Sequence, residues 1–306
     1  MRHLDGAAVA AALPWGGLVA ALRATFAAGC HAPLRHRHPM PEGGTLLLMP
    51  AWNDTHAGVK LVHVAPANTS RGLPAVAASY LLSDSRTGVP IALLDGGELT
   101  DRRTAAASVL AASFLARGDS RRLLVLGAGK VAAALAEAHH AHFGLAEVAI
   151  WARRAEQAEA LARRLAAHGV PARAAATPDP TGFDIVSSAT LATQPIIRGQ
   201  DLAPGQHLDL VGAFTARMRE ADAAAVARAL VVADTRAGVL AEGGDVVQAI
   251  AEGAVTEAQV AAELADLCRG AHPGRTRAEE VTLFKSVGWA GEDLAAAVMA
   301  VSGHGG

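Results

Sequence analysis

Aromatic residues and cysteines are scarce in this sequence, and their scarcity excludes several classes of protein. Aromatics make up 4% of the 306 residues and are not interleaved with clusters of Lys and Arg, so the chain lacks the basic, base-stacking surface of a nucleic-acid binder. A formal net charge of −2 likewise provides no broad basic surface for anionic membranes. The two cysteines, Cys30 and Cys268, stand far apart and outside any metal-ligand or CxxC spacing, which favours reduced thiols and no metal site.

Long hydrophobic runs are also missing, although 51% of the residues are hydrophobic. Gly, Pro, Arg or Asp interrupts the apolar runs well before the roughly 20 residues needed to cross a bilayer. The Ala-rich N-terminal run contains Asp5 and predicts an amphipathic helix, not an export signal. We therefore expect a cytoplasmic protein that acts on a small molecule, with no membrane and no nucleic acid as partner.

Between about residue 120 and residue 240, the sequence repeats a short apolar run, a loop and an Ala-rich stretch with helical spacing. This alternation is typical of β-α-β units, in which helices cover both faces of a parallel sheet. Two of the helical stretches end at Gly144 and Gly169, where glycine is a common helix stop. The predicted strands are the compact apolar runs Leu123–Leu126, Val148–Trp151, Phe183–Val186, Leu208–Val211 and Leu230–Ala233.

The chain before this repeat has strand and helix signals without the same rhythm. Runs such as LLLMPAW, VKLVHV and PIALLDGG are typical of strands joined by turns. We therefore predict an α/β protein with a first domain over residues 1–116 and a doubly wound Rossmann domain over residues 117–279. The final VTLFKSVGWAGEDLAAAVMAVSG predicts a strand or loop that leads into a last helix.

The run LLVLGAGKVAAAL places small residues at the three positions of a dinucleotide-binding turn. Gly127 permits the tight turn, Gly129 lets the backbone approach a pyrophosphate, and Ala132 allows the helix to pack closely on the strand. The helix N-terminus then supplies N–H donors and a positive dipole to the phosphates. The predicted cofactor-binding residues of this turn are Gly127, Ala128, Gly129, Lys130 and Val131.

The end of the second predicted strand indicates which dinucleotide binds. NAD-preferring sites usually have Asp or Glu here for the ribose 2′-hydroxyl, whereas this chain has Arg153 and Arg154. Two guanidinium groups suit a 2′-phosphate, although the pair can also be a solvated helix start. We therefore expect NADPH as cofactor, with NADH possible.

A series of further motifs extends over nearly the whole chain. The motifs are PLRHRHPM, LLLMPAW, VKLVHVAPANTSRGLPA, SYLLSDSRTGVPIALLDGGELTDRRTAAAS, LGAGKVA, SSATLATQPII, VGAFTARMREAD and VTLFKSVGWAGEDLAAA. In their order and spacing, these motifs resemble the ornithine cyclodeaminase/μ-crystallin family. The resemblance implies a homodimer. It also implies that residues 280–306 complete the first domain, which then holds the substrate and the dimer interface, with the Rossmann domain inserted between the two parts.

The same resemblance implies three cationic substrate residues, Arg35, Lys60 and Arg103, with Arg37 as an alternative to Arg35. Arginine suits this role because its planar fork matches the carboxylate of an amino or imino acid. Two hydroxyl residues match positions near the cofactor, Thr104 and Ser286, for which a simple cap or turn is the competing interpretation.

One departure from the family pattern bears on the reaction. Cyclodeaminases and the related alanine dehydrogenases have an acid in a G-x-D run after the fourth strand, and this chain has Phe214 there. A phenyl ring cannot accept the proton of a distal amine, but it can pack against an apolar ring in the substrate pocket. Three nearby carboxylates, Asp209, Glu220 and Asp222, cannot be placed from the sequence.

The resemblance and this departure together predict an NAD(P)H-dependent reductase of cyclic imino acids. Such an enzyme gives L-proline from Δ1-pyrroline-2-carboxylate or L-pipecolate from Δ1-piperideine-2-carboxylate. In this hypothesis Arg35 and Arg103 bind the carboxylate, and Lys60 helps to hold the substrate and protonates the imine. The alternatives are an ornithine cyclodeaminase, an alanine dehydrogenase and, in another class, a non-catalytic NADPH-dependent ligand-binding protein like μ-crystallin.

Overall fold

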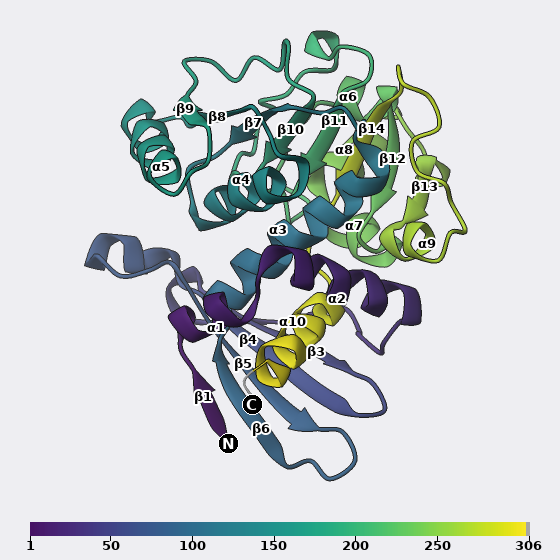
Figure 1. Ribbon diagram of the computed structural model, residues 1–306. Helices are drawn as coiled ribbons and strands as arrows, with labels where there is room; N and C mark the ends of the chain where they lie inside the picture. Colours follow the sequence, from purple (N-terminus) through teal and green to yellow (C-terminus); the bar gives the residue numbers. More distant parts are fainter. Residues whose placement is uncertain (304–306) are drawn as a thin grey trace. The chain divides into compact units, whose positions relative to one another are not determined.

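The computed structural model describes residues 1–303, and the chain divides into two compact units (Figure 1). Unit 1 comprises Met1–Arg103 and the C-terminal segment from Trp289, and unit 2 comprises Thr104–Gly288. These bounds differ from the expected limits at 116 and 280. The first boundary falls inside the helix Gly96–Leu115, whose two parts belong to different units, and the second moves because residues 281–285 form a strand of the unit 2 sheet.

Unit 1 is built on a six-stranded mixed sheet in the order β1-β6-β5-β4-β3-β2. β1 runs parallel to β6, and the remaining neighbours are antiparallel, so the strands from β2 to β6 form consecutive hairpin-like pairs. The strands are β1 (Arg2–Leu4), β2 (His36–Pro39), β3 (Thr45–Trp52), β4 (His56–Val64), β5 (Val76–Asp84) and β6 (Pro90–Asp95), with short 3₁₀ helices at Pro41–Gly43 and Pro66–Arg71.

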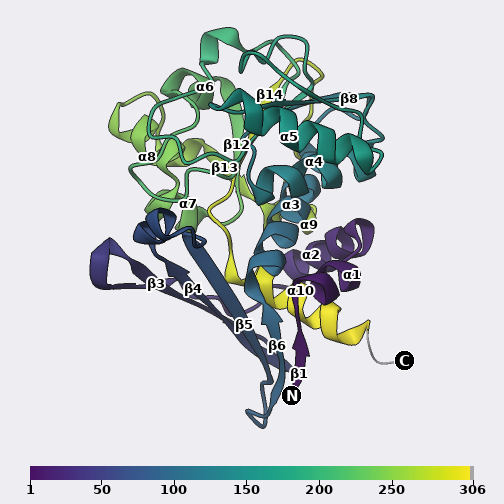
Figure 2. The ribbon, with the colours of Figure 1, turned by 90° about the vertical axis from the view of Figure 1, so that its left-hand side faces the viewer.

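Three helices lie on one face of this sheet: α1 (Gly6–Ala12), α2 (Trp15–Ala28) and α10 (Ala290–Ser302) (Figures 1 and 2). α10 contacts β3, β4, β5 and α2, and so becomes the central helix of the layer although it is the last element of the chain. Asp5 caps α1 by accepting a hydrogen bond from the Ala8 amide, which confirms the predicted N-terminal helix.

Within residues 1–303, no single helix is long and apolar enough to span a membrane. Only the bent pair formed by α1 and α2 meets the length and composition of a span, with an angle of 78° between its two helices.

Unit 2 is built on an eight-stranded sheet in which all the neighbouring strands are parallel, in the order β13-β12-β14-β11-β10-β7-β8-β9. The five predicted strands are present, and their ends differ from the predicted ones by at most two residues. The strands are β7 (Arg122–Leu126), β8 (Glu147–Trp151), β9 (Ala172–Ala174), β10 (Ile185–Ser188), β11 (His207–Leu210), β12 (Ala229–Ala233), β13 (Val260–Glu263) and β14 (Val281–Lys285).

Two apolar cores, one on each face of this sheet, confirm the predicted doubly wound arrangement. One core includes residues from α4 and α5, and the other includes residues from α6 and α8. Gly144 ends α4 in the left-handed conformation, as expected for a helix stop. The helices are α3 (Gly96–Leu115), α4 (Lys130–Phe143), α5 (Ala155–Ala167), α6 (Ala223–Arg228), α7 (Arg236–Glu242), α8 (Gly244–Ala251) and α9 (Leu264–Cys268), with 3₁₀ turns at Gly199–Asp201 and Glu257–Gln259.

The strand order places a switch point between β7 and β10. The chain leaves β7 toward β8 and β9 on one side, then returns to form β10 on the other side of β7. Ligands of open parallel sheets bind outside the carboxyl ends of the strands at such a point.

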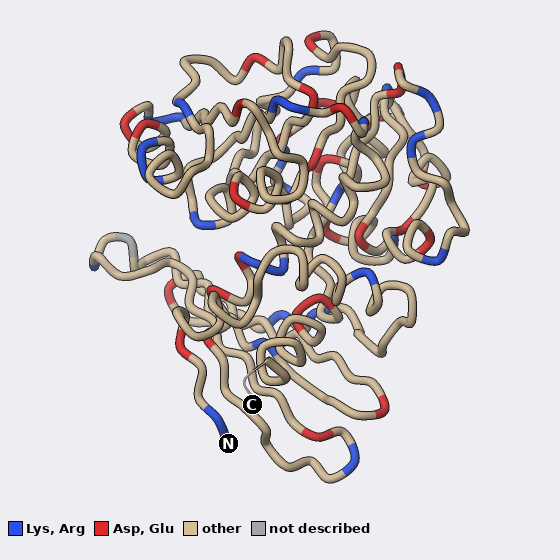
Figure 3. Tube along the Cα trace, in the orientation of Figure 1, with Lys and Arg blue, Asp and Glu red and all other residues tan. Residues whose placement is uncertain are grey.

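Acidic and basic residues are interspersed along the trace of both units (Figure 3).

Candidate functional site

The glycine turn after β7 lies at this switch point. Gly127 has a φ of +124°, and a Cβ there would come within 2.7 Å of the Ala189 carbonyl oxygen, which follows β10. A side chain is therefore excluded at Gly127 on both conformational and steric grounds. Gly129 forms the N-cap of α4, and a Cβ built there meets nothing within 4 Å, so its backbone faces open space.

The geometry of the turn fits the pyrophosphate of a dinucleotide. Ala132 is fully buried, as expected where α4 packs on the sheet, whereas Lys130 is exposed at the first position of the helix. Ala128 and Val131 are half-buried on either side of the N-cap. Because the helix start carries no side-chain cap, its N–H groups and positive dipole are directed at an approaching anion.

Arg153 and Arg154 are exposed between β8 and α5, beside the glycine turn. The Trp151 carbonyl at the end of β8 accepts a hydrogen bond from the Gly127 amide at 2.8 Å, which joins the end of the strand to the turn. Arg154 is the N-cap of α5 without a side-chain cap bond. In Rossmann units, residues at this position after the second strand contact the 2′-hydroxyl or 2′-phosphate of the ribose.

Two predicted cofactor neighbours are buried in unit 2. Thr104 lies in α3, and Ser286 directly follows β14. The Ser286 hydroxyl donates to Asp234 Oδ2 at 2.8 Å, and the same oxygen accepts the amides of Val287 and Gly288. Ser286 thus belongs to a hydrogen-bond network that stabilises the loop after β14. Contact of Thr104 or Ser286 with the cofactor stays a prediction. The role of Asp234 was missed, although an acid directly after a parallel strand is a usable signal.

Phe214 is half-buried in the loop after β11, and a neighbouring carboxylate fixes that loop. Glu220 is fully buried and accepts hydrogen bonds from the Gly212 and Ala213 amides, and from the Thr190 amide and hydroxyl. Burial raises the pKa of Glu220, whereas its donors favour the ionised form. Glu220 therefore joins the loops that follow β10 and β11.

The other two carboxylates left open by the sequence also have structural partners. Asp209 is fully buried and accepts a hydrogen bond from the Ser187 hydroxyl, and burial raises its pKa from 3.8 to about 6. Asp222 caps α6 through the Ala225 amide and accepts the Gly199 amide. Hydrogen bonds within the fold engage both acids. The structure therefore gives no support for either acid as a substitute for the carboxylate that Phe214 replaces.

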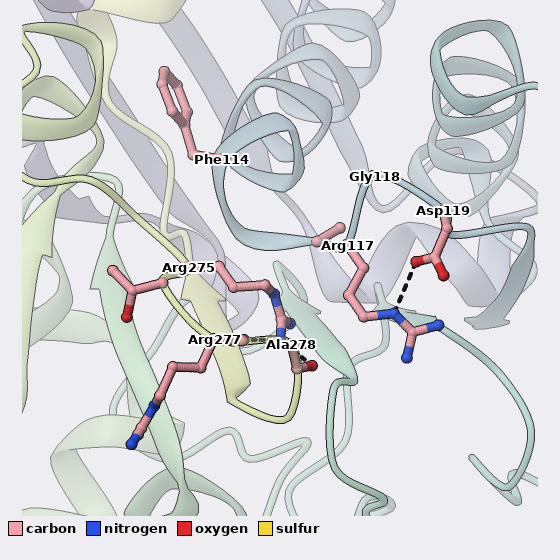
Figure 4. Close-up of a pocket in the computed structure, with 9 residues that line it drawn as sticks. Phe114, Arg117, Gly118, Asp119, Arg275, Arg277 and Ala278 are labelled. Atoms are coloured by element: carbon pink, nitrogen blue, oxygen red, sulfur yellow. Dashed lines mark hydrogen bonds and ion pairs between the residues drawn. The ribbon is translucent and has the colours of Figure 1, made fainter.

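A cavity of about 590 Å³ in unit 2 lies away from all these residues, at the amino ends of the strands (Figure 4). The segments that lead into β7 and β14 line it, including Arg117 and Arg275. Arg117 pairs with Asp119 at 2.9 Å, and Arg275 donates to the Leu115 carbonyl at 2.7 Å. The protein itself engages these guanidinium groups, and no predicted site residue lines the cavity.

A second group of predicted residues comes together in unit 1, centred on Lys60. On β4, Lys60 is directly opposite Met49 of β3 and Tyr80 of β5, so the three side chains point to the face that α10 covers. Lys60 and Tyr80 are almost completely buried. A Cβ at Gly58 would collide with the Tyr80 ring, so the glycine makes room for it.

Two carboxylates from α10 hold the buried cations. Asp293 Oδ1 accepts Lys60 Nζ at 2.9 Å and Arg103 Nε at 2.9 Å, and Glu292 Oε2 accepts Arg103 NH1 at 2.6 Å. Asp293 and Glu292 are fully buried, and Arg103 is 4% exposed. The structure therefore brings together Lys60 and Arg103, which are far apart in sequence, and adds two acids that sequence reasoning missed. Their signal was an acid pair in an otherwise apolar helix.

The charges around Lys60 shift its proton affinity. The pKa of Lys60 is lowered from 10.5 to about 8, chiefly by burial and then by the Arg103 charge, whereas the Asp293 carboxylate opposes this shift. Arg35 also lowers this pKa, so its charge acts on the cluster. Arg35 is half-buried, whereas Arg37 is exposed on β2 opposite Leu47. These observations favour Arg35 over Arg37 as the third cation.

The doubly wound sheet and its glycine turn define unit 2 as a dinucleotide-binding Rossmann unit. The profile of the ornithine cyclodeaminase/mu-crystallin family matches residues 16–302, and the chain belongs to that family. It is 42% identical over 288 residues to the Δ1-pyrroline-2-carboxylate reductase of Paracoccus denitrificans, with 92% of this chain and 90% of that protein covered.

Two solved structures are similar over almost their whole length. The Thermococcus litoralis Δ1-pyrroline-2-carboxylate reductase, in complex with NADH and L-proline, has a TM-score of 0.94 and 31% identity, with 99% of this chain and 97% of that chain covered. An archaeal alanine dehydrogenase dimer with bound NAD has a TM-score of 0.93 and 26% identity, with 99% and 95% covered.

Proposed function

We propose that the protein is an NAD(P)H-dependent reductase of cyclic imino acids, which forms L-proline from Δ1-pyrroline-2-carboxylate and L-pipecolate from Δ1-piperideine-2-carboxylate. The observation that carries the proposal is the buried group of Lys60 and Arg103, held by Asp293 and Glu292. Burying charged side chains costs free energy, which ion pairs and hydrogen bonds offset only in part. A buried group of four charges therefore indicates a function. The name of the relative from Paracoccus denitrificans, and the bound ligands of the Thermococcus litoralis enzyme, support the same reaction.

The charges around Lys60 suit a substrate with one carboxylate and no second positive charge. Arg103 and Arg35 both add positive charge near Lys60 and lower its pKa. Guanidinium groups of this kind bind a substrate carboxylate. A diamino acid such as ornithine would bring a further positive charge close to these cations, which disfavours its binding.

The residues of unit 1 bind the substrate and supply its proton. Arg35 and Arg103 hold the carboxylate, and the Lys60 ammonium donates a proton to the imine nitrogen. A pKa lowered to about 8 keeps Lys60 largely protonated at neutral pH yet able to release its proton. The bound nicotinamide supplies the hydride, so that one proton and one hydride convert the C=N bond into CH–NH.

Phe214 favours reduction of a preformed ring over ornithine cyclisation. Cyclisation needs a base for the distal amine, and the carboxylates near this loop have structural partners, as described for Glu220, Asp209 and Asp222. A half-buried phenyl ring offers an apolar surface for the methylene groups of a five- or six-membered ring. Alanine dehydrogenase activity is the second candidate, because the similar archaeal structure carries that name.

Arg153 and Arg154 support NADPH as the preferred cofactor. They stand where a carboxylate would otherwise bind the ribose 2′-hydroxyl, and both are exposed to an incoming phosphate. NADH remains part of the proposal, because the Thermococcus litoralis enzyme was solved with NADH.

The test is NADPH oxidation by purified protein with Δ1-pyrroline-2-carboxylate, measured by absorbance beside piperideine-2-carboxylate, pyruvate plus ammonia, and ornithine with NAD⁺. Oxidation with the cyclic imines alone supports the proposal. Turnover of ornithine alone would replace it with a cyclodeaminase, and turnover of pyruvate with ammonia alone would replace it with alanine dehydrogenase. Binding of NADPH without any turnover would favour the non-catalytic ligand-binding protein.

We also propose that the protein is a homodimer whose subunits meet through the unit 1 sheet. α1, α2 and α10 cover one face of this sheet (Figure 2). The alternate positions of β3, β4, β5 and β6, which point to the other face, carry half-buried apolar side chains in register. Exposed apolar patches of this kind mark interaction surfaces. The patch consists of Leu46, Leu48, Pro50, Val59, Leu61, Leu81, Ile91 and Leu93.

Light scattering during gel filtration tests the dimer. Because it pairs with Leu61, Leu48 lies within the patch, so Leu48→Lys should shift the particle mass from two chains to one. The control Leu73→Lys changes an exposed leucine outside the patch and should leave the mass unchanged. A wild-type protein with the mass of one chain would refute the proposal.

A cytoplasmic location belongs to the same proposal. Cys30 and Cys268 form no disulfide in the described part of the chain, which suits a reducing compartment. Thiol titration of the denatured protein without reductant should find two reactive thiols, whereas a loss of both thiols would count against this location.

A further inference from the structure

Asp293 lies within the C-terminal motif VTLFKSVGWAGEDLAAA, but no role was assigned to it from the sequence. It lies in the first turn of α10 and is fully buried, and its Oδ1 accepts Lys60 Nζ and Arg103 Nε at 2.9 Å each. Since both donors meet one oxygen atom, their nitrogen atoms cannot separate by more than twice that distance. The second oxygen, Oδ2, is buried and has no hydrogen-bond partner among the described residues.

We propose that Asp293 is a positioning residue for imine reduction, which fixes Lys60 relative to Arg103 through one shared oxygen and keeps the lysine charged. The proposal rests on the proposed function, since it assigns how the proton donor is held. Asp293 acts through Lys60 and Arg103, and no contact of its own with substrate is required.

The charges that face Lys60 oppose one another. Burial, Arg103 and Arg35 favour its neutral form, whereas the Asp293 carboxylate favours the ammonium. Tyr80 faces Lys60 from β5, and burial raises the pKa of its hydroxyl well above 10, so Tyr80 stays neutral over the working range. Removal of the Asp293 charge should therefore release Lys60 protons at a lower pH.

The adjacent acid provides a matched control. Glu292 is equally buried and also belongs to the first turn of α10, but it pairs with Arg103 at 2.6 Å instead of bridging the two cations. Glu292→Gln and Asp293→Asn therefore remove the same charge one residue apart. A general loss of negative charge, or a general loss of packing, would affect both variants alike, whereas Asp293 Oδ1 is the oxygen that accepts both Lys60 Nζ and Arg103 Nε.

The first experiment observes Lys60 directly and does not depend on turnover. The chain has three lysines, Lys60, Lys130 and Lys285, so ¹³C-labelled lysine gives a spectrum in which Lys60→Met assigns the Lys60 signal. Asp293→Asn should lower the titration midpoint of Lys60 by about one pH unit or more, as expected for loss of an opposite charge at this range. Glu292→Gln should shift it by less than half as much.

The second experiment records the pH dependence of kcat/KM with Δ1-pyrroline-2-carboxylate. The wild type should lose activity above about pH 8, because the proton donor is then neutral. Asp293→Asn should move this alkaline limb to lower pH, and Asp293→Glu should restore its position while kcat stays roughly 10-fold low, since the longer side chain displaces the oxygen.

The two experiments separate the possible failures. An unchanged Lys60 midpoint in Asp293→Asn, or an equal shift in Glu292→Gln, overturns the positioning role. If Asp293→Asn does not fold, Asp293→Glu decides: wild-type kcat overturns the proposal, and low kcat with an unmoved limb supports it. If the wild type does not reduce the imine although the lysine midpoints shift as expected, the proposed function fails while the geometric role of Asp293 stands.

Discussion

Both units bury charged side chains, but they satisfy these charges in different ways. In unit 1, Lys60 and Arg103 pair with the side-chain carboxylates of Asp293 and Glu292 from α10. In unit 2, the buried Lys285 forms an ion pair with Asp245 at 3.0 Å, and acids are in excess.

The difference lies in the donors that the acids use. Glu220 and Asp245 accept mostly backbone amides, from loops that they join, so their charges serve the local fold. The acids of α10 instead accept the long cationic side chains of Lys60 and Arg103. The backbone-bound acids therefore stabilise loops, whereas the acids of α10 position the two side chains to which we assign substrate binding and proton transfer.

The largest expected effect tests the two buried lysines against each other. Lys60→Met should lower kcat for the cyclic imine by roughly 1,000-fold and leave NADPH binding intact, because the general acid is lost. Lys285→Met should keep kcat within a few-fold while lowering the melting temperature, since it leaves buried Asp245 without its cation. Steady-state kinetics, NADPH titration and thermal unfolding measure the three quantities. An equal loss of kcat in Lys60→Met and Lys285→Met would contradict the difference in role between the two buried lysines.

Next in size is the effect of a structural carboxylate. Glu220→Gln places an amide NH₂ among N–H donors and should lower the unfolding free energy by about 3 kcal/mol, as measured by denaturant titration. The matched change Glu252→Gln removes an exposed acid that pairs with Arg219, and should have a much smaller effect. A Glu220→Gln protein of normal stability would show that the backbone-bound acid is dispensable.

A third effect concerns pH and stability. The folded-state pKa of Asp209 is raised from 3.8 to about 6, so the folded protein holds this proton more tightly than the unfolded chain. Its ionisation should therefore reduce the unfolding free energy as pH rises from about 4 to about 6, by on the order of 2 kcal/mol, with no further change above. Asp209→Asn should abolish this decline in denaturant titrations at several pH values. If the unfolding free energies of the wild type and the variant differ by the same amount at every pH, the raised pKa is contradicted.

The smallest effect concerns exposed cations of unit 2. The double change Arg153→Ala and Arg154→Ala should raise the KM for NADPH about 10-fold and leave the KM for NADH nearly unchanged, because only NADPH carries the 2′-phosphate. Parallel kinetics with both cofactors provide the control. Equal increases for both would assign the pair to general electrostatic attraction instead of phosphate recognition.

The sequence predicted unit 2 better than unit 1, for a physical reason. The glycine turn and the strand runs are local patterns, in which residues near in sequence are near in space. The strand Val281–Lys285 was assigned to the wrong side of the expected boundary, because a single apolar run does not reveal its neighbours in the sheet.

The cluster around Lys60 shows the opposite case. Lys60 and Arg103 were named through a family resemblance, since their local patterns alone suit solvent-facing charges. Asp293 was missed because its contact with Lys60 spans 233 positions in the chain, and no local periodicity encodes such a pair. The fold as a whole determines this contact, through the packing of α10 on β4.

The boundary between the two units falls inside α3, between Arg103 and Thr104. Any exchange of Rossmann units among relatives, by recombination or by design, must therefore cut a continuous helix and rejoin it in phase. A single inserted or deleted residue at that junction would rotate everything beyond it by about 100°, given 3.6 residues per turn. Gene fusions that keep the helix length should be tolerated far better than those that change it by one codon.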